Sequence, residues 1–346
     1  MNILLTSAGR RTYLVEYFKN ALAGKGKVYA SNSIDTYTLH QADGYVITPA
    51  IYDSEYVGFL ISYCKKNDIS AIISLFDIDL PVLAKHKPDF ENEGITIVVS
   101  DYQVTQICND KWQTYEFLVR LGLPQTPSYL NLQDLKNDIA TGVVHYPFIL
   151  KPRWGMGSIG IYKACNEKEL DVLYAKLHQE IFDTYLKYES NADAGSCIII
   201  QQMINGQEYG IEVLNDLNGN YVTTFAKKKI AMRSGETDIA MTVNPAAFVD
   251  TAKLISEKLR HIANLDVDCF ETEDGKLVVL EMNCRFGGQY PFTHNAGVDV
   301  PRQIVEWLEG GHTNMSLLQQ KDGVVSCKEL NPVEFTTVKI APPNSK

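Results

Sequence analysis

The 346-residue sequence predicts an α/β protein, with a doubly wound parallel sheet in its first part and a mixed α+β arrangement in its second. Short apolar runs alternate with helical stretches as far as residue 99, which is typical of parallel strands joined by helices. Further along, strand-like runs follow one another across turns, which is typical of antiparallel pairing. Two segments also indicate a functional site: a glycine-rich turn near residue 157 and a hairpin over 268–288.

Composition and charge limit the classes of function. The chain is 45% hydrophobic and 21% charged, which is ordinary for a globular protein of two or three domains. A formal net charge of −10 argues against a nucleic-acid binder or a protein held on an anionic membrane, because both need basic surfaces. No apolar run approaches the roughly 20 residues that cross a bilayer, and the N-terminus lacks the apolar core of a signal peptide. The seven scattered cysteines form no Cys-x-x-Cys pair, so we expect a cytoplasmic protein with reduced thiols.

The first part of the chain is a succession of strands and helices. Residues 2–6 are apolar and lead through a Ser-Ala-Gly turn into helical spacing over 10–22. The segments that follow are strands at 27–31, 44–48, 71–74 and 95–99 and a helix at 54–66. The loops after the strands should lie on one rim of the sheet, where such folds bind ligands. A dinucleotide site is disfavoured, because the first turn lacks the G-x-G-x-x-G pattern.

Two helices and a glycine-rich turn come next. The helices span 102–108 and 111–121, and the second ends at Gly122. A strand over 143–150 then leads through Lys151 into a turn with three glycines, at 155, 157 and 160. Such glycines let backbone N–H groups face a phosphate, although an ordinary turn explains them equally well in isolation. A strand follows the turn and no G-K-[S/T] ends it, so the turn is a hairpin tip and not a Walker loop.

The middle of the chain continues with a helix over 167–188, a polar linker over 189–195 and strands over 196–202 and 208–214. Glu208 and Glu212 fall on one face of the latter strand, which by itself is typical of a solvated face. A strand over 221–232 then carries three consecutive lysines, which in an acidic chain favour a nearby anion. The polar loop at 233–238 has no apolar anchors, so we expect it to become ordered on ligand binding.

The hairpin over 268–288 carries the strongest site signal. Glu281 and Asn283 are two residues apart on one strand and point to the same face, and Asp268 opens the partner strand. Two carboxylates and an amide oxygen, without a nearby histidine, suit Mg²⁺ shared with substrate phosphates. Arg285 adds an anion clamp on the same side. A predicted helix over 249–263 precedes this hairpin. A helix at 297–308 and short strands at 324–327 and 334–340 follow it.

In order and spacing, these motifs resemble the ATP-grasp superfamily, and most closely single-unit ligases similar to the carbamoyl phosphate synthase large subunit. The resemblance spans essentially the whole chain and rests on Lys151 with the glycine turn, the segment Gln201 to Ile204 followed by Glu208, the Arg-Ser-Gly-Glu-Thr segment, and the hairpin. It implies a pre-ATP-grasp domain over 1–108, linker helices and a small lid subdomain over 109–195, and an ATP-grasp core with the Mg-ATP site over 196–346.

The same resemblance implies a role for each matching residue. The ATP contacts would be Lys111, Lys151, Met156, Gly157, Ser158, Gln201, Gln202, Met203, Ile204 and Glu208. Asp268, Glu281 and Asn283 would hold Mg²⁺ or, alternatively, Mn²⁺. Lys151, Arg233 and Arg285 would offset charge on the transferred phosphoryl group. Two positions depart from the family pattern: Gln201 stands where Glu is usual, and Asp268 where Gln is frequent.

The resemblance also implies a reaction. An ATP-dependent ligase would activate a small-molecule carboxylate as an acyl phosphate and join it to an amine. Glutamine-dependent carbamoyl phosphate synthesis is disfavoured, because it needs two such units and a partner amidotransferase. Two alternatives stay open: a non-catalytic ATP-binding accessory or regulatory protein, and a phosphotransferase that stops at a phosphorylated small molecule. The sequence identifies neither the acid nor the amine, and a homodimer is compatible with it although no motif points to one.

Overall fold

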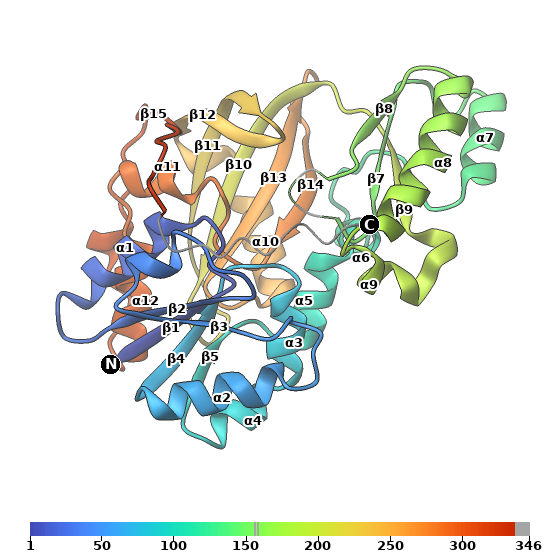
Figure 1. Cartoon of the computed structure of the whole chain (residues 1–346). Helices are drawn as coiled ribbons and strands as arrows, with labels where there is room; N and C mark the ends of the chain where they lie inside the picture. The colour runs from blue at the N-terminus through green and yellow to red at the C-terminus, as the bar shows by residue number, and fades with distance from the viewer. Residues whose placement is uncertain (156, 158, 336–346) are drawn as a thin grey trace. The chain divides into compact units, whose positions relative to one another are not determined.

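The computed structural model describes residues 1–155, 157 and 159–335 (Figure 1). The chain divides into two compact units, each with its own sheets. The first unit comprises Met1–Tyr102, Val298–Gln319 and the segment from Cys327, and the second comprises Gln103–Gly297 and Gln320–Ser326. Within the described residues, no helix has both the length and the apolar character needed to cross a bilayer.

The first unit is built on a five-stranded parallel sheet, which confirms the predicted doubly wound arrangement. Its strands, in spatial order, are β3 (Gly44–Ile47), β2 (Val28–Asn32), β1 (Asn2–Thr6), β4 (Ile69–Ser74) and β5 (Thr96–Val98). The chain moves outward from β1 to β3 on one side and returns to place β4 on the other, so the strand order reverses between β1 and β4. Ligands of such sheets bind at this reversal, beyond the carboxyl ends of the strands.

The described part of the first unit has three helices that the sequence predicted, α1 (Thr12–Leu22), α2 (Tyr56–Lys66) and α12 (Val300–Leu308). It also has four that the sequence did not predict, α3 (Asp79–Lys85), α4 (Lys87–Glu91) and the 3₁₀ helices η1 (Leu39–Gln41) and η4 (Met315–Leu318). Although α12 lies almost 280 residues after α1 in the chain, the two helices pack together. Arg302 of α12 donates a hydrogen bond to the carbonyl oxygen of Ala21 in α1.

A buried carboxylate fixes the rim of this sheet. Asp79 is fully buried and accepts hydrogen bonds from Thr6 at 2.5 Å, Ser74 at 2.8 Å and Tyr56 at 2.7 Å. Burial raises the pKa of Asp79, and the hydroxyl donors oppose that effect. The network therefore ties the end of β1 to the end of β4, where the strand order reverses.

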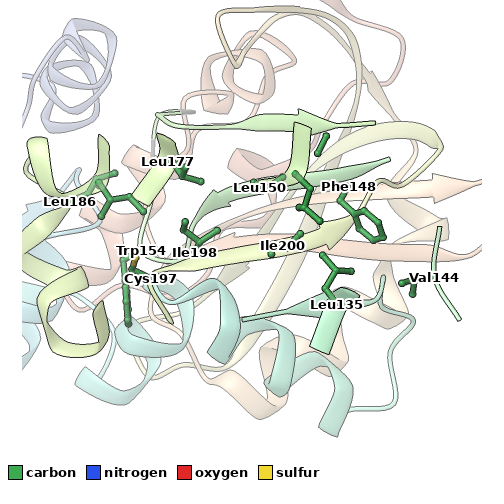
Figure 2. Packing of buried hydrophobic residues seen from close by; sticks show 13 residues of the cluster. Leu135, Val144, Phe148, Leu150, Trp154, Leu177, Leu186, Cys197, Ile198 and Ile200 are labelled. Carbon is green, nitrogen blue, oxygen red and sulfur yellow. The ribbon is translucent and has the colours of Figure 1, made fainter. Parts of the chain in front are cut away.

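The second unit contains a four-stranded sheet covered by helices. Its strands, in spatial order, are β6 (Ser128–Tyr129), β9 (Ile198–Gln202), β7 (Phe148–Pro152) and β8 (Tyr162–Ala164). Helices α7 (Leu132–Ala140) and α8 (Glu167–Asp183) pack against these strands. Figure 2 shows Leu135 and Leu177, from the two helices, gathered with Leu150, Ile198 and Ile200 in one core. This core anchors β7, which ends next to the glycine-rich turn.

A six-stranded antiparallel sheet forms the larger part of the second unit. Its strands, in spatial order, are β14 (Leu277–Asn283), β13 (Asn264–Thr272), β10 (Gly206–Asn215), β11 (Tyr221–Arg233), β12 (Glu236–Val243) and β15 (Val325–Cys327). The remaining helices of the unit are α5 (Tyr102–Asn109), α6 (Lys111–Arg120), α9 (Lys187–Ser190), η2 (Asn191–Ser196), η3 (Pro245–Ala247), α10 (Val249–Leu259) and α11 (Tyr290–Asn295).

Several predicted boundaries were wrong. The loop expected at 233–238 is a two-residue turn, because Ser234 and Gly235 both have positive φ angles and Arg233 pairs with Glu236. The long helix ends at Asp183, and a 3₁₀ helix occupies most of the expected linker. The strand expected at 334–340 lies largely outside the described residues.

Candidate functional site

The hairpin of β13 and β14 brings the three predicted oxygen ligands to one face of the six-stranded sheet. Asp268 lies directly opposite Glu281, and Asp266 lies directly opposite Asn283. Residues that oppose one another across antiparallel strands share a face. We call this face, which also carries Glu208, Glu212, Lys227 and Lys229, the polar face.

Cations surround Glu281. The Nζ atom of Lys111 lies 3.6 Å from its Oε2 atom. Burial alone would raise the pKa of Glu281, but Lys111, Lys151, Lys229 and Arg285 together lower it to about 2. The carboxylate is therefore ionised at neutral pH, as a ligand of a hard cation must be.

A pocket opens beside Glu281 and contains two of the predicted nucleotide lysines. Its lining residues are Lys111, Lys151, Pro152, Gly155, Gly157, Ile159, Ile161 and Glu281. Lys151 is almost fully buried, and burial lowers its pKa to about 8 against the opposing attraction of Glu281. Lys111 also donates a hydrogen bond to the carbonyl oxygen of Gly155. Two cations, a glycine turn and an ionised carboxylate thus meet in one concave space.

An ion pair fixes the two pocket lysines relative to each other. The Arg153 guanidinium makes two 2.8 Å hydrogen bonds with the Asp110 carboxylate, which also caps the start of α6. The backbone N–H of Lys111 donates to the carbonyl of Arg153 at 3.1 Å. The start of α6, which carries Lys111, and the segment just after Lys151 are therefore joined through both side chain and main chain.

The predicted adenine segment comprises the last two residues of β9 and the two residues after it. Gln201 is buried, and its Nε2 atom donates to Ser128 Oγ at 2.9 Å. Its Oε1 atom accepts no hydrogen bond from the described part of the chain. The backbone N–H groups of Gln202 and Met203 donate to the carbonyls of Pro127 and Pro147. The buried Gln201 oxygen is thus an acceptor that a ligand amino group can satisfy.

Lys229 joins two residues that were predicted to have separate roles. Its Nζ atom lies 2.7 Å from Glu208, the predicted ribose ligand, and 2.7 Å from Asp268, a predicted metal ligand. On the same face, Lys227 lies 3.0 Å from Glu212, and both of these side chains are fully buried. The interpretation of Glu208 and Glu212 as a solvated strand face was therefore wrong for Glu212. Lys227 and Lys229 pair with carboxylates of the protein itself.

Asp266 and Gln289 complete the polar face and were not predicted. Gln289 Nε2 donates to Asp266 at 2.5 Å and to Asp268 at 3.1 Å. Arg285 lies 3.7 Å from Asp266. Burial raises the pKa of Asp266 to about 6, helped by the charge of Asp268 and opposed by Arg285. The one feature of the sequence that could have indicated this contact is Gly210, because a glycine inside a strand often marks the close approach of another group. In the structure, an added Cβ at that position would lie 1.7 Å from the Gln289 side chain.

Four further positions were predicted to belong to the site. Arg233 stands at the β11–β12 turn, is 54% exposed in its side chain and pairs with Asp238 at 3.0 Å. Gly157 lines the pocket with a φ of 61°. Met156 and Ser158 lie outside the described residues. The roles assigned to these four positions stay predictions.

The residues present fit Mg²⁺ better than a metal held by the protein alone. Among the described residues, no three His, Cys, Asp or Glu side chains are grouped to hold a metal ion. Glu281, Asn283 and Asp268 supply hard oxygen donors on one face, with cations beside two of them. This donor set suits an ion that takes its other ligands from water and phosphate oxygens.

Comparison with known proteins adds two family matches and several relatives. Residues 3–98 match the family model "PylC-like, N-terminal domain", and residues 144–292 match the model "ATP-grasp domain". The arginine-specific carbamoyl phosphate synthase large chain of Bacillus subtilis is 22% identical over 210 residues, which are 58% of this chain and 19% of that protein. A D-alanine–D-alanine ligase from a Marinomonas species is 34% identical over 109 residues, which are 31% of this chain and 30% of that protein.

Among solved structures, the biotin carboxylase domain of 2-oxoglutarate carboxylase from Hydrogenobacter thermophilus, a dimer in complex with MgADP, ADP and bicarbonate, superimposes with a TM-score of 0.73 at 19% identity. The match covers 94% of this chain and 73% of that one, and it shows a shared fold. The chain spans only 18% to 46% of the length of the first curated relatives. The chain therefore contains an ATP-grasp domain over residues 144–292, and its overall fold is that of this carboxylase domain.

Proposed function

We propose that the protein is an ATP-dependent carboxylate–amine ligase that acts on small molecules. The observation that carries the proposal is the pocket in which Lys111 and Lys151 converge on an ionised Glu281, on the same face as Asp268 and Asn283. The ligase named among the relatives, which joins two D-alanine molecules, supports the reaction class.

In this proposal the nucleotide lies in the pocket between the two sheets of the second unit. Lys111 and Lys151 face the phosphates, because they are the cations that line the pocket. The buried Oε1 atom of Gln201 accepts a hydrogen bond from the adenine amino group. Glu208 accepts hydrogen bonds from the ribose hydroxyls, in exchange for part of its contact with Lys229.

Magnesium would be held by Glu281, Asn283 and Asp268 together with phosphate oxygens. When bound, the ion supplies charge neutralisation and polarises the phosphoryl group that is transferred. Manganese fits the same oxygen donors. The residues of the chain that add to this effect are Lys151 and Arg285, which bring positive charge to the polar face without forming a covalent bond to the substrate.

The reaction proceeds in two steps. A carboxylate oxygen of the first substrate attacks the γ-phosphorus of ATP, the bond to the β-phosphate oxygen breaks, and ADP leaves. An amine nitrogen then attacks the acyl carbon and loses a proton to solvent, the carbon–oxygen bond to phosphate breaks, and inorganic phosphate leaves as the amide forms. No protein nucleophile is required, and exclusion of water protects the acyl phosphate between the steps.

An ADP-release assay with pooled acids and amines tests the proposal. We expect ADP formation that requires both an acid and an amine, with a new amide detected by mass spectrometry. ADP formation with an acid alone and a stable phosphorylated product would instead support the phosphotransferase. Tight ATP binding without turnover in any pool would support the accessory or regulatory protein.

A homodimer is part of the proposal, since the solved relative from Hydrogenobacter thermophilus is described as a dimer. Light scattering of the purified protein measures the mass directly. One chain has a mass of 38.8 kDa, so a monomer and a dimer are easily separated.

A further inference from the structure

Lys229 is buried in the centre of the polar face. Its ammonium group lies 2.7 Å from both Glu208 and Asp268, and only 4% of its side chain is exposed. An ammonium group at this distance from two carboxylates forms an ion pair with each of them, so Lys229 bridges Glu208 and Asp268.

The neighbouring lysines do not share this position. Lys227 lies one step along the same face and contacts Glu212, whereas Lys228 lies opposite Tyr209 and points to the other face of the sheet. Gln289 adds a second donor to the Asp268 oxygen that Lys229 contacts. Asp268 therefore has its negative charge compensated by the protein itself.

We propose that Lys229 is a tethered cation that holds Asp268 and Glu208 together in the nucleotide-free protein and keeps a divalent metal ion from binding at Asp268 until the nucleotide arrives. The inference rests on the proposed function in taking Asp268 as a metal ligand. Two close carboxylates attract a divalent cation, but an ammonium group between them reduces their net charge to −1 and occupies their facing oxygens.

Glu281, on the partner strand of the hairpin, is also balanced by a lysine. The Lys111 ammonium lies 3.6 Å from its carboxylate, so the second carboxylate of the proposed metal site has its charge compensated as well. A free ion thus meets little net negative charge, whereas a metal–nucleotide complex brings phosphate charge that the lysines attract. The expected consequence is a binding order in which the metal enters with the nucleotide.

Manganese titration of the full chain without nucleotide tests this inference, with calorimetry or electron paramagnetic resonance as the readout. We expect weak binding to the unmodified protein. Lys229→Met should bind Mn²⁺ at least about tenfold more tightly, because a unit charge next to the ligand is removed. Lys229→Gln should show the same gain while keeping hydrogen bonds to both carboxylates, which protects the fold. Lys229→Arg keeps the charge and should behave as the unmodified protein.

Two controls define the site. Lys228→Met removes a lysine from the opposite face of the same strand and should leave Mn²⁺ binding unchanged. Adding Asp268→Asn to Lys229→Gln should abolish the gain. The inference is overturned if the unmodified protein binds Mn²⁺ as tightly without nucleotide as with it, or if neither neutral variant gains affinity. ATP binding by the unmodified protein is measured separately. If ATP does not bind, the proposed function is overturned. The Mn²⁺ affinities of the Lys229 variants then still show whether Lys229 keeps a metal ion from Asp268.

Discussion

The Arg153 guanidinium and the Asp110 carboxylate form a two-pronged ion pair, with both hydrogen bonds at 2.8 Å. Asp110 precedes Lys111 in the chain, and Arg153 follows Lys151 by two residues. Only 1% of the Asp110 side chain and 12% of the Arg153 side chain are exposed. The pair therefore holds the start of α6 against the end of β7 and, with them, the two lysines of the pocket.

Arg153→Met should lower the free energy of unfolding by about 3 kcal/mol, because it leaves the buried Asp110 without its ionic partner. It should also raise the KM for ATP, since the side-chain link between the start of α6 and the end of β7 is lost. Arg153→Lys should have a smaller effect, because an ammonium group cannot make the forked contact. Denaturant unfolding and ATP titration measure the two quantities. The matched control is Arg120→Met, at the exposed end of α6, with an expected change within about 0.5 kcal/mol. A folded Arg153→Met protein with unchanged affinity for ATP would contradict the positioning role.

Glu281→Gln should lower magnesium-dependent turnover by about a hundredfold or more, because the ionised oxygen donor is lost. The protein should remain folded, since glutamine has nearly the same shape and the side chain is about one-third exposed. Circular dichroism and steady-state kinetics at several magnesium concentrations separate the two effects. Glu273→Gln, in the exposed turn of the same hairpin, serves as the control. Near-normal activity of Glu281→Gln would remove the metal assignment.

Affinity for ATP should decrease as the pH rises through about 8. Burial lowers the pKa of Lys151 to about 8, so the free protein loses this positive charge above that pH. ATP binding at pH 9 should then take up a proton, because the phosphates restore the charge. Calorimetry in two buffers with different ionisation enthalpies measures that uptake, and Lys151→Met should abolish it.

The contribution of Lys151 to stability has the opposite pH dependence. An ordinary lysine has a pKa of about 10.4, so between about pH 8 and pH 10 the unfolded chain binds more protons here than the folded protein does. This residue therefore makes the folded state more stable as the pH rises through that window. If the Lys151→Met protein takes up as many protons on ATP binding at pH 9 as the unmodified protein does, another group is responsible for that uptake.

Gly210→Ala should lower the free energy of unfolding by about 2 kcal/mol or more. The new methyl group would lie 1.7 Å from Gln289 Oε1, in a position too crowded for the side chain to stay. Gln289→Ala in the same background should restore part of the loss, because it empties the space. Gly58→Ala is the control, since it lies in α2 with no atom within 4 Å of the added carbon and should be neutral or stabilising. A stable Gly210→Ala protein would show that Gln289 can leave its contacts at little cost.

The sequence predicted most of the strands in their order along the chain, but not how they pair within each sheet. Alternation correctly predicted that Glu281 and Asn283 share a face, because side chains in a strand repeat every two residues. The same rule would also put Val279 on that face. The structure instead pairs Val279 with Cys269 and leaves Leu280 as an extra residue next to Asp268. A β-bulge of this kind separates the apolar half of β14 from its polar half, and no residue type in the sequence marks it.

The partners of charged residues were also beyond the sequence. Lysines 227 and 229 were visible as a basic run, yet their pairing with Glu212 and Glu208 depends on the register between β10 and β11. Asp266 and Gln289 lie 23 residues apart and meet only because α11 follows the hairpin back over the sheet. Local patterns thus placed Glu281 and Asn283 on one face, whereas the pairing of Lys227 and Lys229 with carboxylates depends on tertiary structure.

The packing of α12 on α1 has a consequence for synthesis of the protein on the ribosome. The first unit combines Met1–Tyr102 with Val298–Gln319, and Gln103–Gly297 of the second unit lies between them in the chain. The surface of α1 that α12 covers therefore stays exposed until this intervening segment has been synthesised. Most of the second unit has emerged by then, so the first unit begins to form earlier and is completed later.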